Sequence, residues 1–202
     1  LMKNKIILTI DGIRKDRLST YNKNAFNISN NLKRISDQSV VFNDMMACAT
    51  STAMCFASLF TGRYQKDFNR LRFGQNNNPF DDNIFTDHEH KGYKTFVCLN
   101  KRFKKCSDLI NTYGNAEFWW TGHETTSKNK NIGSIRPLEQ VNYALEKINK
   151  IEEPVLLWLH LWGFSKPADE FLEIAPFDYD ARVAELDNAI GVFFDRMNKN
   201  SE

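Results

Sequence analysis

The sequence predicts an α/β fold in which a mostly parallel sheet is flanked by helices on both faces. The chain of 202 residues, 42% of them hydrophobic, is long enough for one packed domain, which we expect to span residues 1–202. Short β-branched and aliphatic runs alternate along it with amphipathic stretches at helical spacing. The runs at residues 5–10 and 154–161 are almost continuously apolar, as expected of strands in a parallel sheet covered on both faces.

The expected elements follow in order along the chain. We expect strands at residues 5–10, 39–42, 93–99, 116–120 and 154–161, and helices at residues 30–38, 52–60, 87–91, 102–111, 137–150 and 178–197. Gly62 and Gly92 suit helix C-termini, and Pro137 suits the first turn of the helix that it begins. Apolar residues recur at helical spacing in the last two helices: Leu138, Val141, Leu145 and Ile148, then Val183, Leu186, Ile190 and Phe194. Residues 65–85 and 121–134 are expected to be polar loops.

The composition argues against several classes of partner. A net charge of +2 is too small to indicate binding to nucleic acid or to an anionic membrane, so we expect no nucleic-acid partner. The four cysteines show no zinc-type spacing, and no disulfide is implied. Because no apolar run approaches about 20 residues, we expect no transmembrane segment and no signal peptide in this chain.

A run of hydroxyl residues opens a short apolar helix within residues 49–64. Ser51 and Thr52 stand at its start, where free backbone N–H groups and the helix dipole favour a negatively charged group. A simpler interpretation is that one of them only caps the helix, because Ser and Thr are common N-cap residues. Local chemistry leaves both interpretations open.

A carboxylate follows the first predicted strand. Asp11 and Gly12 come directly after the apolar run at residues 5–10, and ligands of open α/β sheets bind at the carboxyl ends of the strands. The alternative is that Asp11 only satisfies the turn after the strand, as Asp-Gly pairs often do.

Five short segments, none decisive alone, share one family pattern. They are residues 8–16 (Leu-Thr-Ile-Asp-Gly-Ile-Arg-Lys-Asp), 57–64 (Ala-Ser-Leu-Phe-Thr-Gly-Arg-Tyr), 92–95 (Gly-Tyr-Lys-Thr), 157–162 (Leu-Trp-Leu-His-Leu-Trp) and 179–191 (Tyr-Asp-Ala-Arg-Val-Ala-Glu-Leu-Asp-Asn-Ala-Ile-Gly). In order and approximate spacing they resemble the N-terminal part of the sulfatase family, within the alkaline phosphatase superfamily. The resemblance implies an alkaline-phosphatase-like or sulfatase-like fold. It also implies action on sulfate or phosphate esters of small molecules, glycans or lipids.

The resemblance places Thr52 at the nucleophile position. Counted back from the Thr-Gly-Arg at residues 61–63, Thr52 stands where sulfatases carry a cysteine or serine that matures to formylglycine within a Cys/Ser-x-Pro-x-Arg signature. Met54 and Phe56 occupy the Pro and Arg positions of that signature. A threonine cannot mature to formylglycine and resembles instead the nucleophile of the phosphoethanolamine transferases, where a metal-activated hydroxyl attacks phosphorus. Thr52 is thus expected to be the catalytic nucleophile and a metal ligand.

The same pattern implies further site residues. Asp11 is expected to be an oxygen ligand of a divalent metal, with Arg14 orienting its carboxylate. Lys66 stands near where the family usually has a histidine, and it is expected to neutralise an anionic group in catalysis. Residues 163–165, Gly-Phe-Ser, replace the family's Asp-Pro-His. The family's remaining metal ligands, typically an Asp-His pair on a later strand, would follow the last helix, and the chain ends first.

The histidines are interpreted as surface or structural residues. His88 and His90 superficially resemble a metal-binding pair but are expected on an exposed helix, where positions i and i+2 face different ways. His160 is expected to be a hydrogen-bonded core histidine in a buried strand.

Two functions remain open. The first is a metal-dependent sulfatase-like hydrolase or phosphotransferase, whose complete form binds Ca, Mg, Mn or Zn and of which residues 1–202 form the N-terminal part. The second is a truncated or degenerate, catalytically inactive member with a binding or assembly role. A catalytic divalent ion requires several oxygen or nitrogen ligands. We therefore expect this chain alone to bind no metal, to be inactive and to associate with a missing C-terminal portion.

Overall fold

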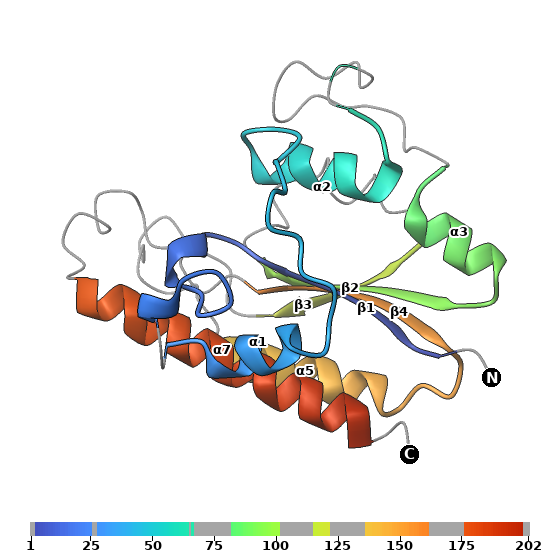
Figure 1. The fold of residues 1–202 in the computed structure, drawn as a ribbon. Helices are drawn as coiled ribbons and strands as arrows, with labels where there is room; N and C mark the ends of the chain where they lie inside the picture. Colours follow the sequence, from blue (N-terminus) through green and yellow to red (C-terminus); the bar gives the residue numbers. More distant parts are fainter. Residues whose placement is uncertain are drawn as a thin grey trace, which may run out of the picture. The chain divides into compact units, whose positions relative to one another are not determined.

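The computed structural model describes residues 3–25, 28–64, 66, 82–101, 115–121, 136–161 and 176–199. Its strands are β1 (Lys5–Ile10), β2 (Lys94–Asn100), β3 (Glu117–Thr121) and β4 (Val155–Leu161). Its helices are α1 (Asn30–Ser36), α2 (Thr52–Thr61), α3 (Ile84–His90), α5 (Pro137–Ile148) and α7 (Pro176–Lys199), with the short 3₁₀ helices η1 (Lys15–Arg17) and η2 (Lys23–Ala25) after β1. The described part of the chain combines one sheet with helices placed between its strands in sequence, so the predicted α/β class is confirmed (Figure 1).

The described strands form one four-stranded sheet in the order β1-β4-β2-β3. Strands β2 and β4 pair in parallel, with residues 94–98 opposite residues 155–159. The side chain of Asn4, just before β1, accepts a hydrogen bond of 2.9 Å from the first backbone N–H of β4. The backbone N–H of Asp11, just after β1, donates to the last carbonyl of β4 at 3.1 Å, so these strands also run in the same direction. Strand β4 is buried along its whole length between β1 and β2, as its continuous apolar sequence predicts.

The chain divides into two compact units. The first comprises Leu1–Thr9, Met45–Trp120 and Ile151–His160, and the second comprises Ile10–Asp44, Thr121–Lys150 and Leu161–Glu202. Helices α2 and α3 belong to the first unit, and helices α1, α5 and α7 belong to the second. The expectation of a single domain over residues 1–202 stays a prediction.

An aromatic cluster joins α2 and α3 to strand β4 in the core of the first unit. The ring centroid of Phe60 lies 4.7 Å from that of Trp158 and 5.1 Å from that of Phe85, both in edge-to-face geometry. All three side chains are buried. Rings of this size contribute much of a core's burial, and edge-to-face pairs add about 0.5–1.5 kcal/mol each.

Helix α7 is the central helix of the second unit, and both α1 and α5 pack against it (Figure 1). The buried Asp187 of α7 accepts hydrogen bonds from the backbone N of Asn31 (2.9 Å) and of Leu32 (2.7 Å) in the first turn of α1. It therefore caps α1 from another helix. A Cβ on Gly191 would lie 2.4 Å from Cγ of Asn31, so a glycine at this position lets α1 approach α7 closely.

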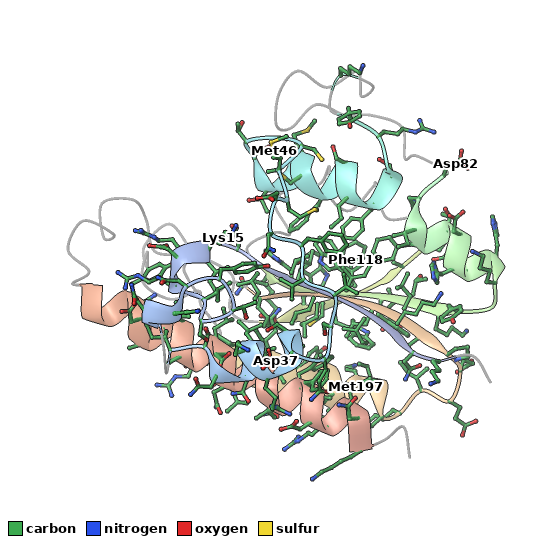
Figure 2. The ribbon with its side chains drawn as sticks, viewed as in Figure 1. Lys15, Asp37, Met46, Asp82, Phe118 and Met197 are labelled. Carbon is green, nitrogen blue, oxygen red and sulfur yellow. The ribbon has the colours of Figure 1, made fainter. Side chains whose placement is uncertain are left out.

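The predicted strand at residues 39–42 is wrong. These residues have no regular secondary structure and take no part in the sheet. Val40 and Phe42 are 82% and 66% exposed, and Met46 further along the same segment is 87% exposed (Figure 2). A short β-branched run becomes a strand only where another strand pairs with it, and tertiary packing decides that.

Helix α3 begins within the segment expected to be a loop. The Oδ1 atom of Asn83 accepts hydrogen bonds from the backbone N of Phe85 (2.9 Å) and Thr86 (3.1 Å), and Oγ1 of Thr86 accepts one from N of Asn83 (3.1 Å). This capping box begins the helix at Ile84 rather than at residue 87. The loop was expected at residues 121–134, but Thr121 is the last residue of β3. The remainder of that loop and the helix expected at residues 102–111 lie outside the described residues.

Candidate functional site

Asp11 lies in the turn that leaves the carboxyl end of β1. Its backbone N–H is fixed to the carbonyl of Leu161 at the end of β4, and its side chain is half-buried. Gly12 follows with φ of 78°, a left-handed conformation that favours glycine and turns the chain away from the strand. The carboxylate therefore stands at the strand end where ligands of open α/β sheets bind.

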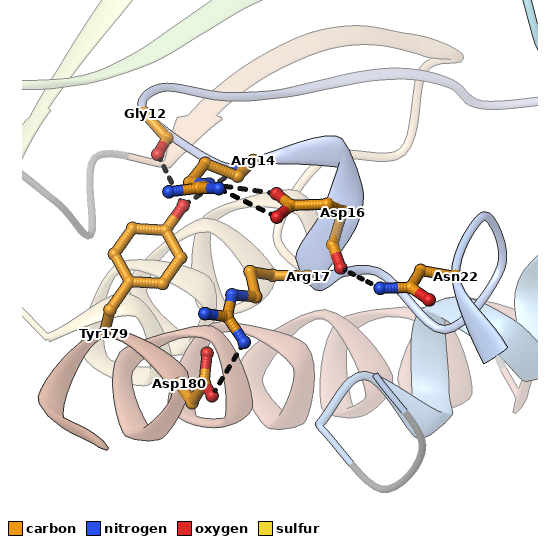
Figure 3. A network of polar contacts seen from close by, with 7 residues as sticks. All are labelled: Gly12, Arg14, Asp16, Arg17, Asn22, Tyr179 and Asp180. Atoms are coloured by element: carbon orange, nitrogen blue, oxygen red, sulfur yellow. Dashed lines mark hydrogen bonds and ion pairs between the residues drawn. The ribbon is translucent and has the colours of Figure 1, made fainter. Parts of the chain in front are cut away.

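A tyrosine from α7 holds the same turn (Figure 3). The hydroxyl of Tyr179 donates to the carbonyl of Gly12 at 2.9 Å and accepts from the backbone N of Arg14 at 2.8 Å. Partial burial raises the pKa of the Tyr179 phenol above its usual value. The hydroxyl therefore keeps the proton that it donates to Gly12.

The guanidinium of Arg14 pairs with Asp16, and its expected role in orienting the Asp11 carboxylate stays a prediction. Its Nε and Nη2 donate to the two carboxylate oxygens of Asp16 at 2.9 and 2.8 Å (Figure 3). This hydrogen bonding raises the pKa of Arg14 and lowers the pKa of Asp16. Both side chains are more than half exposed, so the pair contributes little to stability.

Thr52 is the first residue of α2 and is half-buried. Ser51 occupies the N-cap position in an extended conformation, but its side chain makes no capping hydrogen bond. The first turn of α2 contains no acidic residue to neutralise the positive end of the helix dipole. The interpretation of Ser51 as a mere cap is therefore not supported, and the helix start retains the electrostatic character that favours an anion.

The segment that leads into α2 is tied to the helix by Cys55. The thiol of Cys55 donates to the carbonyl of Ala49 at 3.0 Å, and the backbone N of Cys55 donates to the carbonyl of Ser51 at 3.0 Å. Ala49 also packs against the buried Met54 and Ala57. Cys55 thus serves in local structure at the helix start.

Phe56, at the position of the family's arginine, is part of the core. Its ring lies 4.7 Å from that of Trp158 and 5.0 Å from that of His160, in edge-to-face geometry with both. Only 8% of Phe56 is exposed. Where the Cys/Ser-x-Pro-x-Arg signature has a charged arginine, this chain therefore has a side chain that packs in the apolar core.

His160 is a core histidine, as expected. Its Nδ1 lies 3.0 Å from Oγ1 of Thr9, which also accepts a hydrogen bond of 2.8 Å from Nε1 of Trp158. The residue is fully buried, and this burial lowers the pKa of the imidazole to about 4. The ring is therefore neutral at physiological pH.

His88 and His90 do not form a pair. His88 is buried, contrary to the expectation of an exposed helix, and its Nδ1 lies 2.7 Å from the carbonyl of Ile84. Lys5 Nζ donates to Nε2 of His88 at 3.0 Å, which engages the second ring nitrogen. His90 is exposed. His88 is therefore a structural histidine, and His90 is a surface histidine.

The described residues provide only part of what a divalent metal requires. Asp11 and Thr52 carry oxygen donors that suit such an ion, but no cluster of three or more His, Cys, Asp or Glu side chains occurs within the described part of the chain. Lys66 is exposed, and residues 163–165 lie outside the described residues. Asp11 belongs to the second unit, whereas Thr52 and Lys66 belong to the first.

Across the described ranges, no helix combines the length and apolarity that crossing a membrane requires.

Comparison with known families identifies the class of protein. The sequence model of the sulfatase family matches residues 3–202, so the chain belongs to the sulfatase family. No curated protein matches the sequence significantly.

Solved structures with the same fold include a member of the alkaline phosphatase superfamily. A protein of that superfamily from Vibrio parahaemolyticus is 17% identical with a TM-score of 0.70, and the match covers 98% of this chain and 51% of that one. The C-terminal periplasmic domain of phosphoethanolamine transferase EptC from Campylobacter jejuni is 17% identical with a TM-score of 0.63, covering 98% and 65%. The lipoteichoic acid synthase LtaP from Listeria monocytogenes is 14% identical with a TM-score of 0.70, covering 98% and 53%. The chain thus spans about half to two thirds of the length of these structures.

The structural contacts of Tyr179, Asp187 and Gly191 were not predicted from the sequence. All three residues lie in the segment 179–191, which is one of the five segments that resemble the family. One signal in the sequence was the four-residue spacing of Asp187 and Gly191, which places both residues on one face of the helix. Which partner each residue meets depends on contacts far away in the sequence.

Proposed function

We propose that the chain forms part of a metal-dependent hydrolase or transferase that acts on sulfate or phosphate esters, with Thr52 as the nucleophile. The observation that carries the proposal is the position of Thr52 as the first residue of α2 in a chain of the sulfatase family. Structural neighbours named as a phosphoethanolamine transferase and a lipoteichoic acid synthase support a phosphate ester of a small molecule, glycan or lipid as the substrate.

Thr52 has the chemistry that group transfer requires. Its hydroxyl loses a proton and its oxygen bonds to the sulfur or phosphorus, while the bond to the ester oxygen breaks and the alcohol leaves with a proton. Water then releases the group in a hydrolase, or an acceptor alcohol takes it in a transferase. The backbone N–H groups at the start of α2 suit the negative charge of the transferred group.

Asp11 and Lys66 complete the proposed set within this chain. The Asp11 carboxylate and the Thr52 hydroxyl would be ligands of a divalent Ca, Mg, Mn or Zn ion, and the exposed Lys66 would neutralise part of the anionic substrate. When bound, such an ion lowers the pKa of a coordinated hydroxyl and neutralises charge on the transferred group. Further ligands are required, because such ions take several oxygen or nitrogen donors.

The alternative function is a degenerate member that binds or assembles without catalysis. One observation favours it: Phe56 is packed against Trp158 and His160 where the family signature has an arginine. A phosphate ester enzyme with a threonine nucleophile does not need the formylglycine signature, so the catalytic proposal remains the better supported of the two.

The test is hydrolysis of nitrophenyl phosphate and nitrophenyl sulfate by the full-length protein with added Zn, Mn, Ca or Mg. Thr52→Ala should lower kcat by far more than tenfold, as removal of a covalent nucleophile does. Ser51→Ala is the matched control, because the Ser51 side chain makes no capping bond, and it should stay within about threefold of wild type. A loss below tenfold for Thr52→Ala would exclude it as the nucleophile. Absence of turnover with every metal and both esters would favour the degenerate member.

A further inference from the structure

The backbone around Asp11 is held at three points by groups from distant parts of the second unit. Asp11 N donates to the carbonyl of Leu161, and the next two bonds, at Gly12 O and Arg14 N, both go to the hydroxyl of Tyr179. Gly12 and Tyr179 are 167 residues apart in the sequence. A single oxygen of α7 thus fixes the chain immediately after the proposed metal ligand (Figure 3).

The turn contains a glycine, which by itself restricts the backbone little. Gly12 has φ of 78° and no side chain, so the peptide between Gly12 and Ile13, whose carbonyl Tyr179 bonds, would rotate more freely without that bond. The side chain of Arg14 is engaged with the exposed Asp16. The phenol both donates and accepts, which a phenylalanine ring in the same place cannot do.

We infer that Tyr179 is a positioning residue, which fixes the turn after β1 and thereby aims the carboxylate of Asp11. The inference rests on the proposed role of Asp11 as a metal ligand. Groups that orient a metal ligand typically change metal affinity or activity by 10–100-fold when they are removed, and the Tyr179 hydroxyl acts on the backbone of the ligand residue in this way.

A neighbouring interaction provides the matched control. Asp180, the next residue of α7, accepts a hydrogen bond of 3.3 Å from the guanidinium of Arg17 in η1. This ion pair links the same two segments as Tyr179 does, but its side-chain atoms do not take part in the hydrogen bonds at Gly12 O and Arg14 N (Figure 3). Asp180→Asn therefore loosens the attachment of α7 and leaves both phenol hydrogen bonds in place.

The experiment measures Mn²⁺ binding by electron paramagnetic resonance and hydrogen exchange of the turn amides in the full-length protein. Tyr179→Phe keeps the ring and should weaken Mn²⁺ binding by at least about tenfold, with faster exchange of the backbone amide at residue 14. Asp180→Asn should lower the thermal midpoint at least as much as Tyr179→Phe does and leave Mn²⁺ affinity within about twofold of wild type. Asp11→Asn should abolish the binding. These readouts separate positioning of the ligand from general stability of the second unit.

Two results would overturn the inference, and they have different meanings. If Asp11→Asn loses Mn²⁺ but Tyr179→Phe binds it as wild type does, Tyr179 does not position the ligand, and the proposed function stands. If Asp11→Asn itself binds Mn²⁺ as wild type does, the proposed role of Asp11 fails, and the inference fails with it. Equal losses of affinity in Tyr179→Phe and Asp180→Asn would show a general structural effect and would also overturn the inference.

Discussion

Lowering the pH from 7 to 5 should remove about 2 kcal/mol from the free energy of unfolding, because His160 is buried in its neutral form. The folded-state pKa of about 4 lies below the ordinary value of 6.5, so the unfolded chain takes up a proton before the folded chain does. The stabilisation is therefore fully present above pH 6.5 and is lost progressively as the pH falls toward 4. At pH 5 the difference corresponds to about 1.5 pH units at 1.36 kcal/mol each, which is about 2 kcal/mol.

Urea unfolding of the full-length protein at several pH values between 5 and 7.5 measures this dependence. His160→Asn should be less stable than wild type at pH 7 because it loses ring packing against Phe56, but the difference should shrink by about 2 kcal/mol at pH 5. Thr9→Val removes the hydroxyl next to Nδ1 and keeps the burial, which is the main cause of the shift, so it should retain the pH dependence of wild type. A stability difference between wild type and His160→Asn that stays constant from pH 7.5 to 5 would refute the reasoning.

Three substitutions, two in the second unit and one in the first, test the packing inside each unit by urea unfolding. Asp187→Ala should cost about 2 kcal/mol because it leaves two backbone N–H groups of α1 without their acceptor, whereas the exposed neighbour Asn188→Ala should change stability by less than about 0.5 kcal/mol. Gly191→Ala should destabilise by about 1 kcal/mol, since overpacking against α1 outweighs the gain in helix propensity; a more stable variant would show that α1 yields easily. Phe56→Ala should cost about 3 kcal/mol, and Leu59→Ala on the exposed side of the same helix should be nearly neutral; equal costs would contradict the burial of Phe56.

The sequence predicted the elements with strong periodicity and missed those that depend on a partner. The apolar runs that became β1 and β4 and the amphipathic stretches that became α5 and α7 correspond to elements of the structure within a few residues. Residues 39–42 have the composition of a strand, but they are exposed because no strand pairs with them. Helix α3 starts at a capping box whose Asn-x-x-Thr spacing was visible in the sequence.

The sequence predicted where the candidate site residues stand relative to the strands and helices, but it did not predict which residues they contact. Asp11 follows β1 and Thr52 begins α2, as the family pattern implied. The pairing of Arg14 with Asp16 was not predicted, because the sequence shows two nearby carboxylates and the fold of the turn brings Asp16 to the guanidinium. The contacts of Tyr179 could not be predicted, because they join positions more than 160 residues apart.

By itself, the sequence determined the α/β class, the sulfatase family and the positions of the proposed nucleophile and metal ligand, because hydrophobic period and motif spacing are local properties of the chain. Only the tertiary structure decided the order β1-β4-β2-β3, the capping of α1 by Asp187, and the attachment of the Asp11 turn to Tyr179. It also decided that the imidazole of His160 stays neutral in the core. Each of these features depends on which segments, far apart in the sequence, pack together, exclude water and form hydrogen bonds with one another.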